Sequence, residues 1–375
     1  MRFMSDRQAS PKWGVISLGL ILFALSTGGC TQLRQLGTAQ SSANQFYLLT
    51  SPSSETGTIS LIHLSSDEAV SVSDNVASAG NAPNDADLAG GYLYVVNSTD
   101  STITRYNAGT LAVDTQLSAG NGANPYEQAF LTDGQSYVSN LLTHTVSVID
   151  WDRTPTLATT ITLPSGNALL ADAGQVTFAY PQAIATDNGK VYVGLTNHTG
   201  NYSYYAKGIL TVINGTTGAI EKNIQLSHKN PQQIYRHPSF PNRLFITLSG
   251  AYDGTGVIDI VNTLTDTVEN SFSTGGAPGK MVLNSAGKGV VTDATFGAGT
   301  KILLINVNSR AKTGDATLTT SGYASALGID TDDRLYITSS VFGGQSTLYV
   351  STIDGTTIGN PITVPASPIA LTYTR

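Results

Sequence analysis

Three of the five histidines lie in short polar segments and are the side chains best suited to chemistry. His144 lies in Leu142-Thr-His-Thr, His198 in Thr196-Asn-His-Thr and His228 in Leu226-Ser-His-Lys. An imidazole can bind a metal ion or transfer a proton near neutral pH. The three are therefore candidate ligand contacts. The competing interpretation is that they are ordinary solvated turn residues.

Aromatic and amide side chains accompany these histidines. The two longest insertions, about 164–180 and 198–207, are long enough to form functional loops. The second contains Tyr202, Tyr204 and Tyr205, which could stack on a sugar or a quinone ring or could be plain turn residues. Three more candidate ligand contacts follow prolines at a repeated position: Tyr126, Gln182 and Gln232. Because glutamine amides are poor metal ligands, we expect no metal site here.

Motifs for covalent or phosphate chemistry are missing from the sequence. It contains no Gly-x-Ser-x-Gly elbow, no P-loop and no His-Glu-x-x-His pair, so no catalytic residue and no cofactor can be assigned. Asp85 and Asp87 either face a central channel or simply end a strand. The net charge is −7 and no basic patch stands out, which argues against a nucleic-acid partner.

A repeated β unit must position these side chains. An aromatic or apolar strand recurs seven times, roughly 43 to 55 residues apart, a spacing typical of propeller blades. Its copies are Tyr47-Leu-Leu-Thr, Tyr94-Val-Val-Asn, Tyr137-Val-Ser-Asn, Tyr192-Val-Gly-Leu, Phe245-Ile-Thr-Leu, Val290-Val-Thr-Asp and Tyr336-Ile-Thr-Ser. A second β-branched strand follows each, as in Thr145-Val-Ser-Val-Ile-Asp, with the alternation typical of strands.

A third element precedes six of the seven opening strands and usually begins with proline, as in Pro125-Tyr-Glu-Gln-Ala. The first opening strand lacks it, and an unused copy, Pro368-Ile-Ala-Leu-Thr-Tyr, ends the chain. The C-terminal copy can therefore become the inner strand of the N-terminal blade, which removes the exposed edges of an open array. We predict an all-β, seven-bladed β-propeller over residues 44–375, closed by its C-terminal strand.

The repeat register places most candidates together. His144 and His198 fall between the second and third strands of successive blades, and His228 falls between two blades. In a propeller both kinds of loop open on one face. We expect a small-molecule ligand or an envelope protein to bind at that loop-rich face.

The strands Tyr94–Tyr106 and Tyr137–Asp150 resemble the YVTN family of β-propeller repeats. The resemblance covers about residues 44–375, sharply in the second and third blades and less so in the last three. It implies the propeller fold. Because the motif is a strand signature, it carries no catalytic residue to this chain.

The first thirty residues predict a secretion signal. Arg2, Arg7 and Lys12 precede an apolar run, Gly14–Leu25, which is too short for a comfortable membrane span. Small residues then lead to Cys30, the single cysteine, as in the lipobox of bacterial lipoproteins, although Thr27 replaces the usual leucine. We predict a signal peptide at 1–29, a lipid on Cys30 that binds the membrane, and a flexible tether at 30–43. Thr31 favours the outer membrane, and an ordinary cleaved signal is the alternative.

Three functions remain open from the sequence. The first is a noncatalytic binding or scaffolding lipoprotein of the bacterial cell envelope. The second is a propeller enzyme, lactonase-like or resembling a quinone-dependent dehydrogenase, with its site at the channel mouth. The third is a surface adhesin.

Overall fold

The computed structural model describes most of the repeat region. The described residues are 44–52, 56–65, 69–131, 134–152, 154–164, 179–198, 205–295, 297–341 and 344–374. Cys30, the predicted signal and the predicted tether lie outside these ranges. The described residues form strands and turns without a helix, and accordingly no helix among them could cross a membrane.

Twenty-eight strands form seven four-stranded antiparallel sheets, each with one strand in every radial position. The innermost strands are β4 (Pro83–Ala89), β8 (Pro125–Phe130), β12 (Pro181–Asp187), β16 (Pro231–Arg236), β20 (Pro278–Leu283), β24 (Tyr323–Ile329) and β28 (Pro368–Tyr373). The second strands are β1 (Gln45–Thr50), β5 (Tyr92–Asn97), β9 (Gln135–Asn140), β13 (Lys190–Leu195), β17 (Arg243–Leu248), β21 (Lys288–Asp293) and β25 (Leu335–Ser340). The third strands are β2 (Thr56–Leu64), β6 (Thr102–Asn107), β10 (Thr145–Asp150), β14 (Ile209–Asn214), β18 (Val257–Asn262), β22 (Thr300–Asn306) and β26 (Ser346–Ser351). The outer strands are β3 (Val70–Asn81), β7 (Val113–Ser118), β11 (Thr156–Thr162), β15 (Ile220–Gln225), β19 (Thr267–Ser273), β23 (Ala311–Thr319) and β27 (Thr357–Val364).

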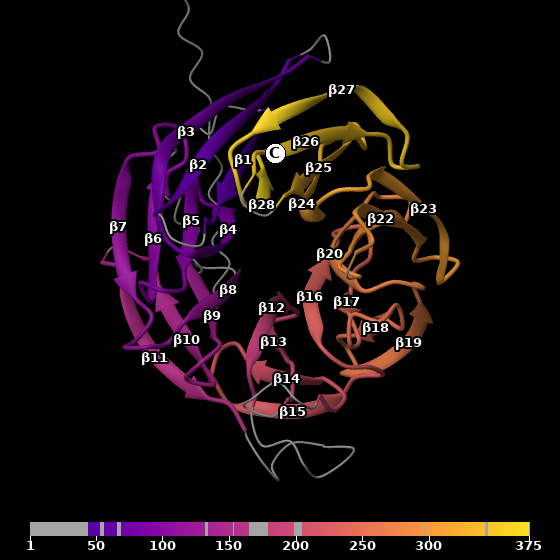
Figure 1. Ribbon diagram of the computed structural model, residues 1–375. Coiled ribbons are helices and arrows are strands. Elements are labelled where there is room, and N and C mark those ends of the chain that lie inside the picture. Colours follow the sequence, from indigo (N-terminus) through magenta and orange to yellow (C-terminus); the bar gives the residue numbers. More distant parts are fainter. Residues whose placement is uncertain are drawn as a thin grey trace, which may run out of the picture. The chain divides into compact units, whose positions relative to one another are not determined.

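The seven sheets are the blades of a closed ring, with the innermost strands around the centre (Figure 1). One blade combines both ends of the described chain in the order β28-β1-β2-β3. Strand β28 pairs antiparallel with β1, and Leu48 lies opposite Leu371. The predicted seven-bladed propeller, closed by its C-terminal strand, is confirmed.

The hydrophobic core is divided among the seven joints between blades. Each joint holds one cluster of buried apolar side chains drawn from two neighbouring blades. The cluster around Phe46, Leu48 and Tyr336 joins the last blade to the first. Ring closure therefore buries the same kind of surface as every other joint.

At three of the joints, the tyrosine that opens the repeated motif fastens its blade to the next. The hydroxyl of Tyr47 donates to the carbonyl of Ala108 at 2.6 Å, and that of Tyr137 donates to Gly215 at 2.7 Å. Both carbonyls belong to turns between the third and outer strands of the following blade. Both tyrosines are about 1% exposed, so a buried hydroxyl finds its acceptor across the joint.

A bulge recurs near the start of the innermost strands, and the third residue of the motif supports it. The hydroxyl of Ser139 accepts the backbone N–H of Glu127 at 3.2 Å and donates to the Gln182 carbonyl at 2.6 Å. Thr292 accepts the N–H of Lys280 at 2.9 Å. The bulge and this hydrogen bond thus fix the position of the third residue of the inner strand, Glu127 or Lys280.

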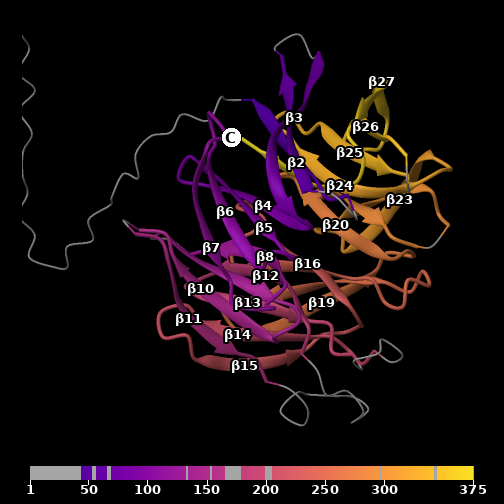
Figure 2. The ribbon, with the colours of Figure 1, turned by 60° about the vertical axis from the view of Figure 1, so that its left-hand side comes forward.

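The outer strands are largely exposed and polar, and the longest hairpin, β2–β3, projects beyond the neighbouring blades (Figure 2). In β11 six of seven residues are exposed. These strands complete each sheet while contributing little to the core.

Candidate functional site

The histidines selected from the sequence lie in loops on one face of the ring. His144 is in the β9–β10 turn, His198 lies three residues after the end of β13, and His228 lies between β15 and β16. Tyr180 contacts both of the first two, with ring centroids 4.7 Å from His144 and 3.9 Å from His198. Tyr205 continues the row, 5.1 Å from His198. Tyr202 and Tyr204 lie outside the described residues.

This row is a packed contact between blades. His198 is 2% exposed, and burial together with His198 lowers the pKa of His144. His228 stands apart from the row and contacts the Thr255 hydroxyl at 3.0 Å. Within the described ranges, no three His, Cys, Asp or Glu side chains converge closely enough to hold a metal ion.

The three inner-strand candidates occupy the second residues of β8, β12 and β16. Tyr126 and Gln232 are partly buried, and the Gln232 amide donates to the Tyr252 hydroxyl at 3.2 Å. The side-chain oxygen of Gln182 is buried without a partner among the described residues. All three lie near the loop-rich end of the inner strands.

A cavity of about 630 Å³ lies at the centre of the ring, a size suited to small-molecule ligands. All seven innermost strands line it, from Asp85 and Glu127 at third positions to Tyr373, the last residue of β28. Exposed Arg236 and Pro238 line it at the end away from the histidine loops. Of the histidines, tyrosines and glutamines selected from the sequence, those that the structure describes do not line this cavity.

Charged side chains come from the third position of three inner strands: Asp85 of β4, Glu127 of β8 and Lys280 of β20. The Lys280 ammonium lies 3.2 Å from the Glu127 carboxylate, between strands three blades apart. Asp87, two residues after Asp85, adds a third carboxylate to the lining. Asp85 and Asp87 therefore face the channel, which settles the alternative that the sequence left open.

The third-position acceptors also link neighbouring blades. The Asp85 carboxylate accepts the N–H of Gln128 at 3.0 Å, and the Glu127 carboxylate accepts that of Ile184 at 2.9 Å. The Gln233 amide oxygen accepts the N–H of Met281 at 2.6 Å. Each donor is the fourth residue of the next inner strand. Alignment of the proline-led repeats on their third residue could have revealed this ring from the sequence.

Burial makes ionisation of the carboxylates unfavourable. It raises the pKa of Glu127 to about 7, although Lys280 opposes the shift. Burial also raises the pKa of Asp85, and it raises that of Asp87 well above the usual range with help from the charges of Asp85 and Glu127. For Lys280, burial lowers the pKa, but Glu127 and Asp85 outweigh it and raise the pKa overall. The carboxyls of Asp85, Asp87 and Glu127 thus all interact electrostatically with one cation, Lys280.

Gln128 is the most unusual side chain of the cavity. It is 4% exposed, and neither its amide nitrogen nor its amide oxygen has a hydrogen-bond partner among the described residues. An unpartnered buried amide costs roughly 1–3 kcal/mol per polar group. A built polar site that accepts a ligand or ordered water explains such a group better than a packing role does.

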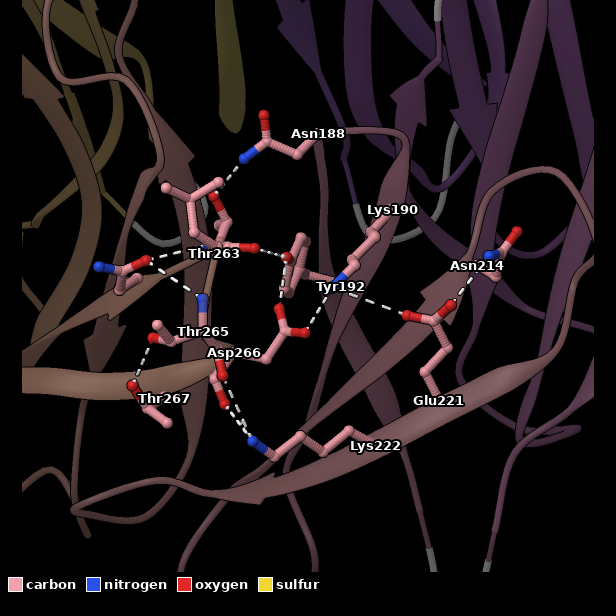
Figure 3. A network of polar contacts seen from close by, with 12 residues as sticks. Asn188, Lys190, Tyr192, Asn214, Glu221, Lys222, Thr263, Thr265, Asp266 and Thr267 are labelled. Atoms are coloured by element: carbon pink, nitrogen blue, oxygen red, sulfur yellow. Dashed lines mark hydrogen bonds and ion pairs between the residues drawn. The ribbon is translucent and has the colours of Figure 1, made fainter.

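A second polar cluster joins two blades at the far face and serves structure. Figure 3 shows Asp266 between Lys190 and Tyr192, with the ammonium at 2.5 Å and the hydroxyl at 2.8 Å. Tyr192 also donates to the Thr263 carbonyl at 3.2 Å. Burial and Asp266 raise the pKa of Tyr192 above its usual value. Every group is paired, so this network is another version of the tyrosine link between blades.

Comparisons with known proteins support the fold. No protein-family model matches the sequence, and no curated protein matches it. Hydrazine synthase from Kuenenia stuttgartiensis is similar, with a TM-score of 0.59, 15% identity, and coverage of 77% of this chain and 89% of that chain. Virginiamycin B lyase from Staphylococcus aureus has a TM-score of 0.56, 16% identity, and 75% and 84% coverage. The Dos1 propeller has a TM-score of 0.59, 12% identity, and 88% and 87% coverage. At such identities the likeness concerns the fold alone.

Proposed function

We propose that this chain is a noncatalytic, small-molecule-binding β-propeller of the bacterial cell envelope, with its ligand site in the central channel. The observation that carries the proposal is Gln128, whose amide is buried and unpartnered beside a cavity of about 630 Å³. A polar ligand that hydrogen-bonds this amide removes the penalty of leaving it unpaired. The envelope assignment rests on the residues before the ring.

The envelope part of the proposal follows from residues 1–30, with their basic start, apolar run and small residues before Cys30. A diacylglyceryl group on Cys30 holds the ring at the outer membrane through the tether. The Tyr-Val-x-Asn strands, which become β5 and β9, support membership of the YVTN repeat family. Replacement of Cys30 by alanine is expected to abolish incorporation of an alkyne-labelled fatty acid and to release the chain from the membrane fraction. Undiminished labelling of Cys30→Ala would contradict the anchor.

Thermal unfolding with and without candidate ligands tests the binding site. The full chain is compared with Gln128→Leu, which keeps the bulk of the side chain and removes its amide. The panel contains 2-phenylethylamine, 3-phenylpropanoate, glucose and ubiquinone-0. We expect at least one compound to raise the Tm of the wild type and to lose that effect in the variant, since a ligand stabilises only the state that binds it. A Tm that no compound raises, or equal effects on both chains, would refute a channel site.

One observation favours an enzyme as the second candidate. Glu127, with its pKa raised to about 7 and Lys280 at 3.2 Å, has the properties of a general base. Two of the similar structures are named as a synthase and a lyase. A lactonase-like chain would hydrolyse γ-butyrolactone and lose most of its kcat in Glu127→Gln. A chain resembling a quinone-dependent dehydrogenase would instead reduce ubiquinone-0 when supplied with its substrate.

A further inference from the structure

The walls of the channel cavity differ in chemistry. Strands β4 and β8 contribute Asp85, Asp87 and Glu127, and the cation Lys280 of β20 is bonded to Glu127. Arg236, the other basic residue of the lining, is engaged at the mouth by Asp187 of β12, at 2.8 Å. The lining therefore has more carboxyls than available cations.

Asp87 is the carboxyl without a partner. Asp85 accepts the N–H of Gln128, and Glu127 accepts both the N–H of Ile184 and the Lys280 ammonium. Among the described residues, no side-chain hydrogen bond or ion pair involves Asp87, although it lines the cavity. Together with the unpartnered amide of Gln128, it gives the cavity unused acceptor oxygens on neighbouring strands.

The adjoining wall, which begins at β28 next to β4, is largely apolar. Strands β24 and β28 line the cavity with Leu327, Ile329, Ile369 and Leu371, and Phe46 of β1 lies beside them. Phe46 and Leu327 are buried, whereas Ile329, Ile369 and Leu371 are only partly buried and offer hydrocarbon surface to a bound molecule. Its burial is worth about 25 cal/mol per Å² of apolar area. A ligand that fits both walls has one cationic donor end and one apolar end.

We propose that the channel ligand is a small organic amine, whose ammonium group donates to Asp87 and Gln128 and whose apolar part packs against β24 and β28; this rests on the channel-binding function proposed above. An ammonium matches the acceptors in number because it carries three donors and no acceptor. Its charge also offsets the excess of carboxyls. A metal ion fits less well, since within the described ranges no three such ligands converge.

Calorimetric titration of the full chain with matched probes tests the inference. The probes are 2-phenylethylamine, its neutral counterpart 2-phenylethanol and its anionic counterpart 3-phenylpropanoate. We expect the amine alone to bind measurably at pH 8. Asp87→Asn should weaken amine binding about tenfold or more, as expected for loss of a charge-assisted hydrogen bond. Asp354→Asn, whose carboxylate lies on the exterior with 66% of its side chain exposed, is the matched control and should bind like the wild type.

A second variant, Lys280→Gln, should have the opposite effect on amine affinity. Lys280→Gln removes the competing cation, so the affinity for 2-phenylethylamine should rise severalfold. General damage to the fold would lower affinity in both variants, whereas the inference requires one loss and one gain. A loss in both variants, with an intact unfolding transition, overturns the assignment of the carboxyls as the amine site.

The pH dependence supplies an independent reading. The groups that face Glu127 are Asp85 and Asp87 of β4, Lys280 of β20 and Tyr126 of its own strand. Burial raises the pKa of Asp87, and it raises that of Glu127 to about 7. Because an ammonium group favours the charged carboxylates, amine binding should release protons and be stronger at pH 8 than at pH 5.5. A heat of binding that depends on the ionisation enthalpy of the buffer would demonstrate the release. A flat affinity across this range overturns the inference.

The two proposals can fail separately. If 2-phenylethanol or 3-phenylpropanoate binds and the amine does not, and Gln128→Leu removes that binding, the channel is a binding site but not for a cation. If no probe binds and the thermal panel also gives no shift, the channel function itself fails, and the amine inference fails with it.

Discussion

The third residues of the innermost strands β4, β8 and β16 contribute to both the architecture and the chemistry of the channel. Asp85, Glu127 and Gln233 each accept a backbone N–H from the innermost strand of the next blade, so that donor is satisfied across the joint. Where that acceptor is a carboxylate, the same bond places a charge beside the cavity. Structural need and ligand chemistry therefore use the same side chains.

Replacement of Glu127 by glutamine should flatten the dependence of stability on pH. The folded-state pKa of Glu127 is about 7, above the value of about 4.3 typical of an unfolded chain. The folded state thus binds the proton more tightly, and stability falls as the pH rises from about 4.5 to 7. Glutamine keeps an acceptor for Ile184 but has no proton to lose. Tm measured at pH 5 and pH 8 should differ less in Glu127→Gln than in the wild type.

A residual fall is expected in Glu127→Gln because the pKa values of Asp85 and Asp87 are raised as well. The prediction would be contradicted by a wild-type Tm that rises between pH 5 and pH 8, or by a variant with the same slope as the wild type.

The sequence predicted less about individual site residues than about the strands or the ring. His144 and His198 are natural ligand candidates in the sequence because they lie in polar turns. In the structure both side chains pack against Tyr180. Glu127 and Lys280 sit 153 residues apart, and nothing local pairs them. Only the closed ring brings the third residues of β8 and β20 together, so the ion pair required the structure.

Among the elements, the third strand of one blade and the innermost strand of the next meet at a glycine. Gly256 directly precedes β18, and a Cβ built there would lie 2.2 Å from the Pro278 ring at the start of β20. A Cβ on Gly57 would similarly lie 2.4 Å from Pro83, at the start of β4. At these joints, the proline that opens the inner strand is thus packed against bare backbone of the preceding blade.

Gly256→Ala should therefore destabilise the ring. The new methyl group would also lie 2.7 Å from the Gly276 carbonyl, so the joint must separate. Overpacking of this kind typically costs about 1–3 kcal/mol. Gly314→Ala is the matched control, since its Cβ meets only Leu304 at 3.5 Å. Chemical denaturation should show a lower midpoint for Gly256→Ala alone, and equal midpoints would disprove the packing argument.

The elements themselves were largely predictable. The innermost, second and third strands have apolar patterns and recognisable openings, and their number and order follow from the repeats. The outer strands were harder, because a strand such as β11 is exposed over most of its length and shows no alternation. Their strand conformation is set by pairing with the third strand, which a local pattern does not reveal.

For the whole molecule, closure depends on the last strand. Deletion of residues 368–375 should leave β1 with an unpaired edge and open the core cluster around Phe46. We expect a large loss of Tm and aggregation in size-exclusion chromatography, because an open propeller exposes sheet edges. A synthetic peptide of residues 366–375 should restore the unfolding transition. A truncated chain that unfolds like the wild type would show that closure adds nothing.

The fold and the function differ in how far the sequence determines them. Repeats that count to seven and a C-terminal copy without a blade were enough for the ring. Proteins of 12% to 16% identity share this ring under names as different as a synthase, a lyase and a propeller domain. The shared ring therefore does not determine the function, and in the binding function that we propose the deciding side chains are those of the channel, above all Asp87 and Gln128.

The pairing of β28 with β1 also determines when the ring can close during synthesis. Strand β28, which completes the first blade, follows the other described strands in the chain, so six blades can form while the first one has only three strands. Until residue 373 has been synthesised, such a chain lacks the strand that closes the ring. Closure of the ring therefore has to wait until β28 has been synthesised, and a chain that stops before residue 368 cannot complete the first blade.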